Sequence, residues 1–306
     1  RGNDVCFFSR QGKALNRIHR VGNGPGEYKD IGSIDVNPAN GELYLKEMNR
    51  QQIHVYSLDG KFKHSFTFPE GKRMSRMCLF SPDYLIAEQE SKVPDDQDAN
   101  FYPYLLVSTR DGHLDSLDYV QKRNILVKLI VNAENHSYAY LLEPSLIRNG
   151  SRFYIGNPDS DTLFAMNPDR TLEPLLVRIP SHSEEGNKYG LFLRGAAGAY
   201  FFLTKQPMEV PMNSIESLDL KSEEWLYDCR TQEVCRYLLK NKDDASKRVE
   251  GIMFFCYPED CGLAVLKSED LMDAYEAGQL SGELKEIAAG LKADDNPVLM
   301  LIHFKK

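Results

Sequence analysis

Apolar and polar positions alternate along this chain in short runs that tight turns join in pairs. The clearest pairs read VCFFSRQGKALNRI (5–18), IHVYSLDGKFKHSF (53–66) and YLLVSTRDGHLDSL (104–117). Alternation with a period of two is typical of half-buried β-strands. The pattern therefore predicts a β-hairpin at each of these places.

The three turns share residue types as well as spacing. Each turn has a glycine with a hydroxyl residue three positions earlier, in the pairs Ser9 and Gly12, Ser57 and Gly60, and Thr109 and Gly112. We expect the glycines to adopt positive φ and the hydroxyls to bond the turn backbone. Looser copies of the hairpin lie at 163–179 and 225–239, with Asn167 or Asp228 in place of the hydroxyl residue.

A second pair of strands lies upstream of each complete hairpin, so the strands group into fours. The complete groups are 31–68, 77–119, 144–180 and 189–239, and a fifth group begins at 251–267 and ends at 297–304. Four antiparallel strands in about 40 to 50 residues is the period of a β-propeller blade.

The first hairpin, residues 5–20, supplies only the outer two strands of a sixth blade. Six blades close only if the missing strands of the first and last blades come from residues upstream of Arg1. We therefore predict an all-β, six-bladed β-propeller in one domain, residues 1–306, that lacks the N-terminal strands of its first blade.

Two segments depart from the repeat. Residues 120–143 are too long for a plain connection, and their alternating apolar residues predict an extended outer strand. Residues 268–292 predict a short helical insertion within the last blade, since Ser268 and Ser281 suit helix starts and Gly278 suits a helix end.

The sequence resembles a known family at three places. These are RIHRVGNGPGEYKDIGSIDVNPANGELYL (17–45), the hairpin at 53–66, and DNPVLMLIHFKK (295–306). They resemble the bacterial six-bladed β-propeller proteins related to NHL repeats. The resemblance implies an exported cell-envelope protein of a Gram-negative bacterium, periplasmic or on the outer-membrane surface, often a lipoprotein with its lipid anchor upstream, and without established enzymatic activity.

Composition narrows the range of partners. The chain is 42% hydrophobic and 27% charged, a soluble globular profile, and its formal net charge is −8. That charge argues against nucleic acid or an anionic membrane, since both attract clustered Lys and Arg. No apolar stretch approaches the roughly 20 residues of a transmembrane helix.

The glycine-rich stretch VGNGPGEY (21–28) raises the possibility of a phosphate-binding loop. Such a loop needs its glycines between a strand and a helix N-terminus. Here a strand-like segment follows, and Pro25 removes one N–H donor. The stretch therefore predicts a corner between blades, with Glu27 and Tyr28 near the mouth of the central channel.

Long loops fall mainly on one predicted face. The insertions at 89–103, 205–217 and 268–295 all follow the second strand of a blade, and the corner at 21–28 opens on the same face. Binding residues concentrate on long loops of rigid scaffolds. The candidate ligand-binding residues there are Glu27, Tyr28, Arg50, Tyr102, His182, Glu184 and Tyr189.

Signals for metals, cofactors and catalysis are weak. The pairs Cys229 with Cys235 and Cys256 with Cys261 lack the spacing of zinc or redox motifs, although each pair could face across a hairpin. His303 falls in a strand, where a satisfied side chain is expected. We expect no cofactor and no metal, and we assign no catalytic residue.

The favoured function is a non-catalytic binding or interaction module of the bacterial cell envelope. A glycan, a peptide or an envelope protein would bind across the face with long loops. The alternative is a metal-assisted hydrolase, lactonase or lyase with its site in the central channel. A purely structural envelope component is a third possibility.

Overall fold

The structure is a computed structural model that describes most of the chain. The described residues are 3–9, 12–69, 72–89, 102–117, 126–132, 137–142, 146–156, 160–179, 181, 189–211, 222–244, 249, 251–254 and 260–305. The chain divides into two compact units, Arg1–Asn124 and Ile125–Lys306. Each unit is described by itself.

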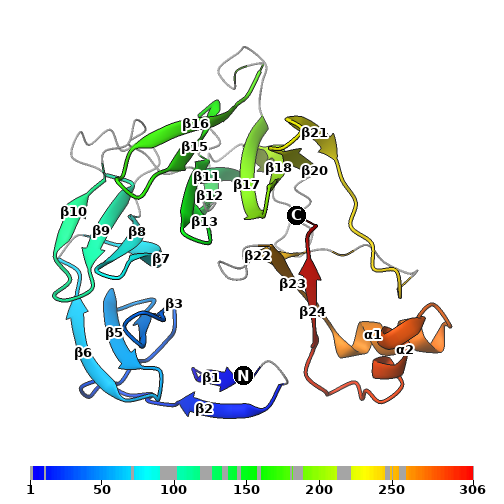
Figure 1. The fold of residues 1–306 in the computed structure, drawn as a ribbon, viewed down its shortest axis with the longest axis horizontal. Coiled ribbons are helices and arrows are strands. Elements are labelled where there is room, and N and C mark those ends of the chain that lie inside the picture. The colour runs from blue at the N-terminus through cyan, green and yellow to red at the C-terminus, as the bar shows by residue number, and fades with distance from the viewer. Residues whose placement is uncertain are drawn as a thin grey trace. The chain divides into compact units, whose positions relative to one another are not determined.

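The first unit holds a hairpin and two four-stranded sheets (Figure 1). The hairpin pairs β1 (Val5–Phe8) with β2 (Ala14–Ile18). One sheet contains β3 (Ser33–Asn37), β4 (Glu42–Lys46), β5 (Gln52–Ser57) and β6 (Phe62–Thr67). The other contains β7 (Met74–Ser81), β8 (Tyr84–Gln89), β9 (Tyr104–Ser108) and β10 (Leu114–Ser116). Both sheets are antiparallel, with strands in chain order.

The second unit repeats this pattern. One four-stranded sheet contains β13 (Leu146–Asn149), β14 (Arg152–Gly156), β15 (Thr162–Met166) and β16 (Leu172–Val177). The next contains β17 (Tyr189–Ala197), β18 (Tyr200–Pro207), β20 (Glu223–Asp228) and β21 (Glu233–Arg236). The last has three strands, β22 (Met253–Phe254), β23 (Cys261–Leu266) and β24 (Val298–His303).

These five sheets confirm the five blade-like groups predicted from the sequence. The prediction of six blades is wrong for the described residues, which form five. The β1–β2 hairpin is a two-stranded sheet, because residues 5–18 supply one strand pair and no other described strand pairs with it.

The segment 120–143 also differs from its prediction of a single outer strand. Its described part forms a hairpin, β11 (Leu126–Asn132) with β12 (Ser137–Leu142). A third strand, β19 (Glu209–Pro211), pairs in parallel with β11 and completes a separate sheet. Pairing with β19 makes β11 the central strand of this sheet.

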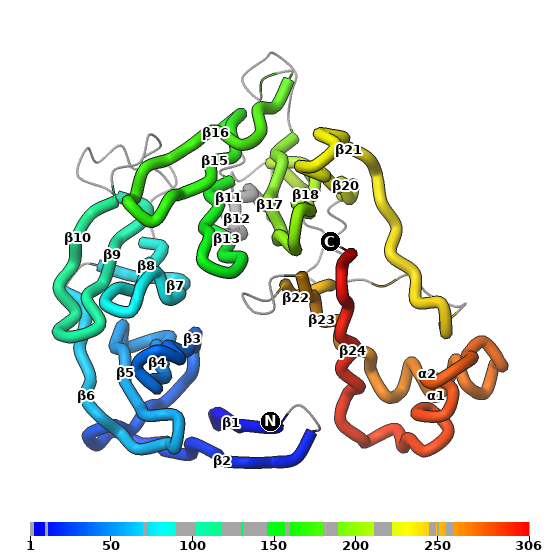
Figure 2. Tube along the Cα trace, viewed as in Figure 1, coloured from blue at the N-terminus to red at the C-terminus, as the bar shows by residue number. Residues whose placement is uncertain are grey.

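Two helices lie between β23 and β24, which pair with each other, as the chain trace in Figure 2 shows. They are α1 (Ser268–Glu276) and α2 (Gly282–Ala288). Ser281 is the N-cap of α2 as predicted, whereas Lys267 caps α1. Ser268 instead donates to the carbonyls of Asp295 and Asn296. Within the described chain, neither helix is long and apolar enough to cross a membrane.

The turn chemistry of the hairpins is confirmed in two of three cases. Gly12, Gly60 and Gly112 all have positive φ, between 75° and 85°. Ser9 and Ser57 accept hydrogen bonds from the backbone N–H four residues on, at 3.2 and 3.1 Å. In the third turn Ser108, not Thr109, bonds the turn backbone, and it accepts the N–H of Arg110 two residues on. The loop that Gly112 closes starts one residue earlier than in the other two turns.

Because side chains alternate between the two faces of a strand, the inner strands of the β3–β6 sheet contribute to two separate hydrophobic cores. In the β3–β6 sheet, Tyr44 and Val55 pack into a core shared with β7–β9. Their neighbours Leu45 and Tyr56 point the other way and pack with Ile18 and Tyr28. The inner strands of this sheet are therefore covered on both faces, which leaves strand ends and loops as the accessible places in it.

Candidate functional site

The candidate site lies at the end of the β17–β21 sheet where its second strand leads to its third. At this end β18 stops at Pro207 and β20 starts at Glu223. The chain leaves the same end after β21, and residues 237–252 lead to β22. We call this the loop-bearing end of the sheet, the end predicted to carry binding residues.

A cavity of about 400 Å³ opens at this loop-bearing end. Its polar lining includes Arg194, Thr204, Glu224 and Tyr237, and its apolar lining includes Ile252 and Phe254. The volume falls in the range of about 300 to 1,000 Å³ that is usual for small-ligand sites. Apolar walls with a few converging polar groups are also typical of such sites.

Glu224 is the acidic group of the cavity. Thr204, which is buried, donates its hydroxyl to the Glu224 carboxylate at 3.1 Å. Tyr237 bonds the same carboxylate. Burial, together with the adjacent Glu224 charge, raises the pKa of Tyr237 to about 12. Tyr237 is therefore a neutral hydroxyl donor beside Glu224.

Arg194 is the basic group, and a β-bulge places it. The register of β17 on β18 shifts between Leu193 and Gly195, which leaves Arg194 as the extra residue. Its guanidinium donates to Oε1 of the fully buried Gln206 at 2.9 Å. It also lies 5.3 Å from the ring centroid of Phe192.

Aromatic rings form the floor of the cavity. The Phe254 ring lies 4.4 Å from that of Phe202, and the Tyr237 ring packs edge-on against Phe202 at 5.3 Å. A Cβ at Gly195 would stand 1.9 Å from the Phe254 ring, so only glycine admits that ring. The cavity therefore combines aromatic surface with one basic and one acidic group.

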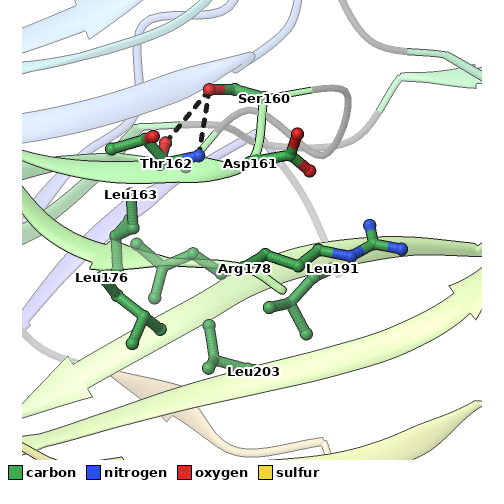
Figure 3. A pocket seen from close by; sticks show the side chains of 10 residues that line it. Ser160, Asp161, Thr162, Leu163, Leu176, Arg178, Leu191 and Leu203 are labelled. Carbon is green, nitrogen blue, oxygen red and sulfur yellow. Dashed lines mark hydrogen bonds between the residues drawn. The ribbon is translucent and has the colours of Figure 1, made fainter. Parts of the chain in front are cut away.

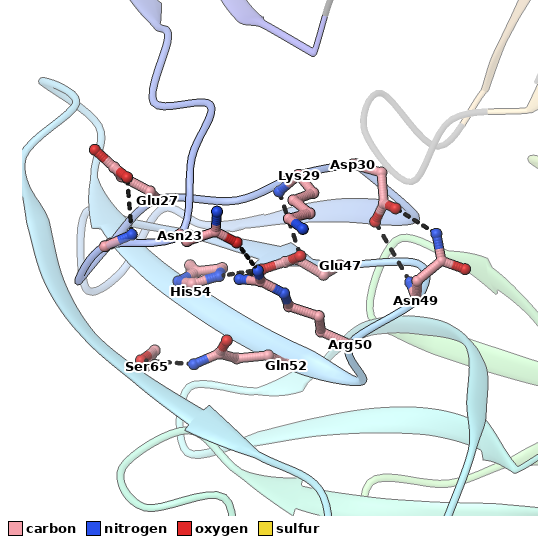
Figure 4. Close-up of polar contacts among 12 residues, drawn as sticks. Asn23, Glu27, Lys29, Asp30, Glu47, Asn49, Arg50, Gln52, His54 and Ser65 are labelled. Atoms are coloured by element: carbon pink, nitrogen blue, oxygen red, sulfur yellow. Dashed lines mark hydrogen bonds and ion pairs between the residues drawn. The ribbon is translucent and has the colours of Figure 1, made fainter.

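A second polar cluster lies at the loop-bearing end of the β3–β6 sheet (Figure 4). Arg50 donates to Asn23 of the glycine-rich corner, and Lys29 N–H donates to Glu47 Oε2 at 3.3 Å. Asp30 accepts the N–H of Met48 at 2.8 Å. These bonds confirm, for this sheet, that the corner and the β4–β5 loop share one end.

Glu47 is the centre of this cluster and is fully buried. His54 Nε2 lies 2.9 Å and Arg50 3.8 Å from Glu47 Oε1. The carboxylate is thus surrounded by donors from its own blade. This arrangement ties two loops together.

The predicted site residues of the first unit have internal partners. Glu27 accepts the N–H of Gly24 at 2.8 Å and so closes its own turn. Tyr28 is fully buried and donates its hydroxyl to the carbonyls of Asn3 and Ile18. Such contacts hold the corner at 21–28 as a packed turn.

The remaining predicted site residues are dispersed. Tyr102 is half-buried and packs on the core of the first unit. Tyr189 starts β17 with its ring 4.9 Å from Lys205 Nζ. His182 and Glu184 lie outside the described residues. Sequence reasoning missed Arg194, Glu224 and Tyr237, because each falls in or beside a strand that reads as ordinary sheet.

A smaller cavity between β15, β16 and β17 is lined by leucines and, on one side, by Ser160, Asp161 and Thr162 (Figure 3). Leu163, Leu176 and Leu191 line it, and Arg178 lies at its edge. Its volume of about 20 Å³ holds about one water molecule. It is a packing gap rather than a ligand site.

The cysteine pairs suggested by the sequence do not form a described disulfide. Cys229 and Cys235 are both free thiols. Cys261 is also free, and its suggested partner Cys256 lies outside the described residues.

The repeated four-stranded sheets define the class of protein, an all-β propeller with few helices. The chain belongs to the family described as Domain of unknown function (DUF4934), which it matches over residues 1–303. No curated protein matches the sequence.

Solved structures share the fold at low identity. A protein described as exported, from Bacteroides fragilis NCTC 9343, is 16% identical with a TM-score of 0.65, and the match covers 99% of this chain and 85% of that one. A member of the duf4221 family from Bacteroides vulgatus is 8% identical with a TM-score of 0.51, covering 98% and 86%.

Proposed function

We propose that this protein is an exported, non-catalytic binding module that holds a glycan in the cavity lined by Arg194, Glu224 and Tyr237. The observation that carries the proposal is the cavity itself, whose lining combines a basic group, an acidic group and aromatic rings. The site lies at the loop-bearing end of its sheet, where the sequence predicts binding.

A sugar ring fits this combination of groups. One face of a pyranose is apolar C–H surface, which packs on an aromatic ring such as Phe254. Its hydroxyls both donate and accept, so they can bond to Glu224 and Arg194 together. A strongly charged ligand would leave one of these two groups facing its own sign.

Export is the second part of the proposal. It draws support from the exported protein of Bacteroides fragilis that shares the fold. A place in the envelope of a Gram-negative bacterium, and a relation to NHL repeats, remain predictions. Fractionation of the native host, with immunodetection of the protein in each compartment, tests the location.

Binding is tested by thermal shift against a panel of neutral and acidic oligosaccharides. A ligand that binds only the folded state at 100 times its Kd adds about 2.7 kcal/mol of stability, which raises Tm. We expect Glu224→Gln and Arg194→Gln each to need at least ten times more ligand than the wild-type protein for the same rise in Tm. Glu233→Gln, an exposed carboxylate of the same sheet, is the matched control.

Two results would contradict the proposal. One is a flat response of the wild-type protein across the panel. The other is a glycan-dependent shift that Glu224→Gln and Glu233→Gln leave equally intact, which would place the ligand elsewhere. Circular dichroism of each variant without ligand checks that the fold is preserved.

A further inference from the structure

Three potential metal ligands meet at the end of the β22–β24 sheet where β23 begins and β24 ends. Cys261 is the first residue of β23 and His303 is the last residue of β24. Strand register places these two residues directly across from each other. The N–H of Phe304 donates to the carbonyl of Asp260 at 2.8 Å. This bond extends the β23–β24 pairing by one residue and holds Asp260 next to Cys261 and His303.

The side chains of Asp260, Cys261 and His303 also lie close together. Cys261 Sγ lies 3.0 Å from His303 Nδ1 and 3.7 Å from Asp260 Oδ1. The three candidate ligand atoms all lie within 4.8 Å of one another. Cys261 is buried, Asp260 is half-buried and His303 is exposed, so the cluster opens to solvent on the histidine side.

These separations fit a tetrahedral ion. With metal–sulfur bonds of about 2.3 Å and metal–nitrogen bonds of about 2.0 Å, neighbouring ligand atoms stand about 3.5 Å apart. The two sulfur distances lie on either side of that value. Metal binding would draw the three side chains together from separations of up to 4.8 Å.

We propose that Asp260, Cys261 and His303 form a binding site for a divalent transition-metal ion of the zinc class. A thiolate, an imidazole and a carboxylate suit Zn²⁺, whereas Mg²⁺ and Ca²⁺ take all-oxygen sets. Three protein ligands leave the fourth tetrahedral position to water or to an exogenous donor.

Cys261 would bind the ion as a thiolate. Metal binding deprotonates a coordinating thiol, so each ion bound would release the Cys261 proton to solvent while the Sγ–metal bond forms.

The metal site and the glycan cavity are formed by different residues. Cys261 and His303 lie where β23 begins and β24 ends. Neither they nor Asp260 line the cavity. Either proposal can therefore fail alone.

Cobalt titration of the full chain, after treatment with a chelator, tests the site. Cobalt bound to a thiolate gives a sulfur-to-metal charge-transfer band in the near ultraviolet. We expect saturation at one ion per chain, release of about one proton, and displacement of Co²⁺ by Zn²⁺. Cys261→Ser should abolish the band, and His303→Gln should weaken binding by about 100-fold.

Cys235→Ser is the matched control, since Cys235 is an exposed free thiol of the neighbouring sheet. His303 is exposed, so His303→Gln should keep the fold even if Cys261→Ser does not. Absence of the band, or a band that persists in Cys261→Ser and disappears in Cys235→Ser, would overturn the proposal. The Cys261–His303 contact would then be an ordinary S–H···N hydrogen bond.

Discussion

Two ion-paired carboxylates of the β3–β6 sheet differ in burial and therefore in their contribution to stability. Glu47 is fully buried among His54, Arg50 and the N–H of Lys29. Asp59 pairs with Lys61 at 2.8 Å, but its side chain is 57% exposed. Solvent screens the Asp59 pair, whereas loss of Glu47 leaves buried donors without an acceptor.

Glu47→Ala should therefore lower the free energy of unfolding by about 3 kcal/mol. Asp59→Asn, the matched control, should change it by no more than the error of the measurement. Urea denaturation followed by far-UV circular dichroism gives both values. Equal losses in the two variants would show that the Glu47 cluster contributes no more than a surface ion pair.

For single residues, the sequence predicts the position in the fold better than the role of the side chain. Glu27 and Tyr28 were chosen because they follow a glycine-rich corner, and the structure uses both to hold that corner. Arg194 could not be predicted from the sequence, because the β17 bulge that places it leaves no sequence pattern other than Gly195. Cys261 and His303 are 42 residues apart in the chain, and only strand pairing brings them together.

The hairpin turns of the first unit share one backbone conformation but differ in the space around them. Gly12 and Gly112 both have φ near +75° to +80°. A Cβ at Gly12 would contact nothing, whereas a Cβ at Gly112 would stand 2.5 Å from the Phe66 ring. Phe66 belongs to the core between two blades, so it cannot easily move away.

Alanine at either glycine should cost about 1–2 kcal/mol, because L-residues are strained at positive φ. Gly112→Ala should cost about 1–3 kcal/mol more than Gly12→Ala, because Phe66 must also be displaced. Chemical denaturation of the two variants measures the difference. Equal costs would mean that the hairpin tip is not packed against Phe66.

The elements themselves were largely predictable, since hairpins are local and repeat. Pattern and turn residues identify all five blade-like groups. The β11–β12–β19 sheet was not predictable in the same way, because β19 and β11 are distant in the chain and pair in parallel. Parallel pairing lacks the tight turn that fixes the register of a hairpin.

Over the whole molecule, several carboxyl groups have pKa values below their ordinary range. They are Asp4, Asp30, Glu42, Asp59, Asp111, Asp169, Glu223 and Asp228. Asp59, Asp111 and Asp169 are exposed, so solvent screens their contributions. Glu42 differs, since its side chain is only 14% exposed and Lys63 Nζ lies 2.6 Å from its carboxylate.

Glu42 therefore provides the sharpest test of acid stability. Burial disfavours its ionised form, but hydrogen bonds from Lys63 and Tyr44, with the Lys63 charge, outweigh burial and lower its pKa. A carboxyl with a lowered folded pKa stabilises the protein above its unfolded pKa. That stabilisation disappears as pH falls through the folded value.

We expect the wild-type Tm to change little between pH 7 and pH 5 and to fall steadily below about pH 4.5. Glu42→Gln should be less stable than wild type by about 1 kcal/mol at pH 7, since it keeps an acceptor but loses the charge. The two curves should approach each other as pH falls through the lowered pKa of Glu42, because the wild-type side chain then becomes protonated as well. Calorimetry across this range measures both, and a gap that does not narrow as the pH falls would show that the Glu42 charge is not responsible.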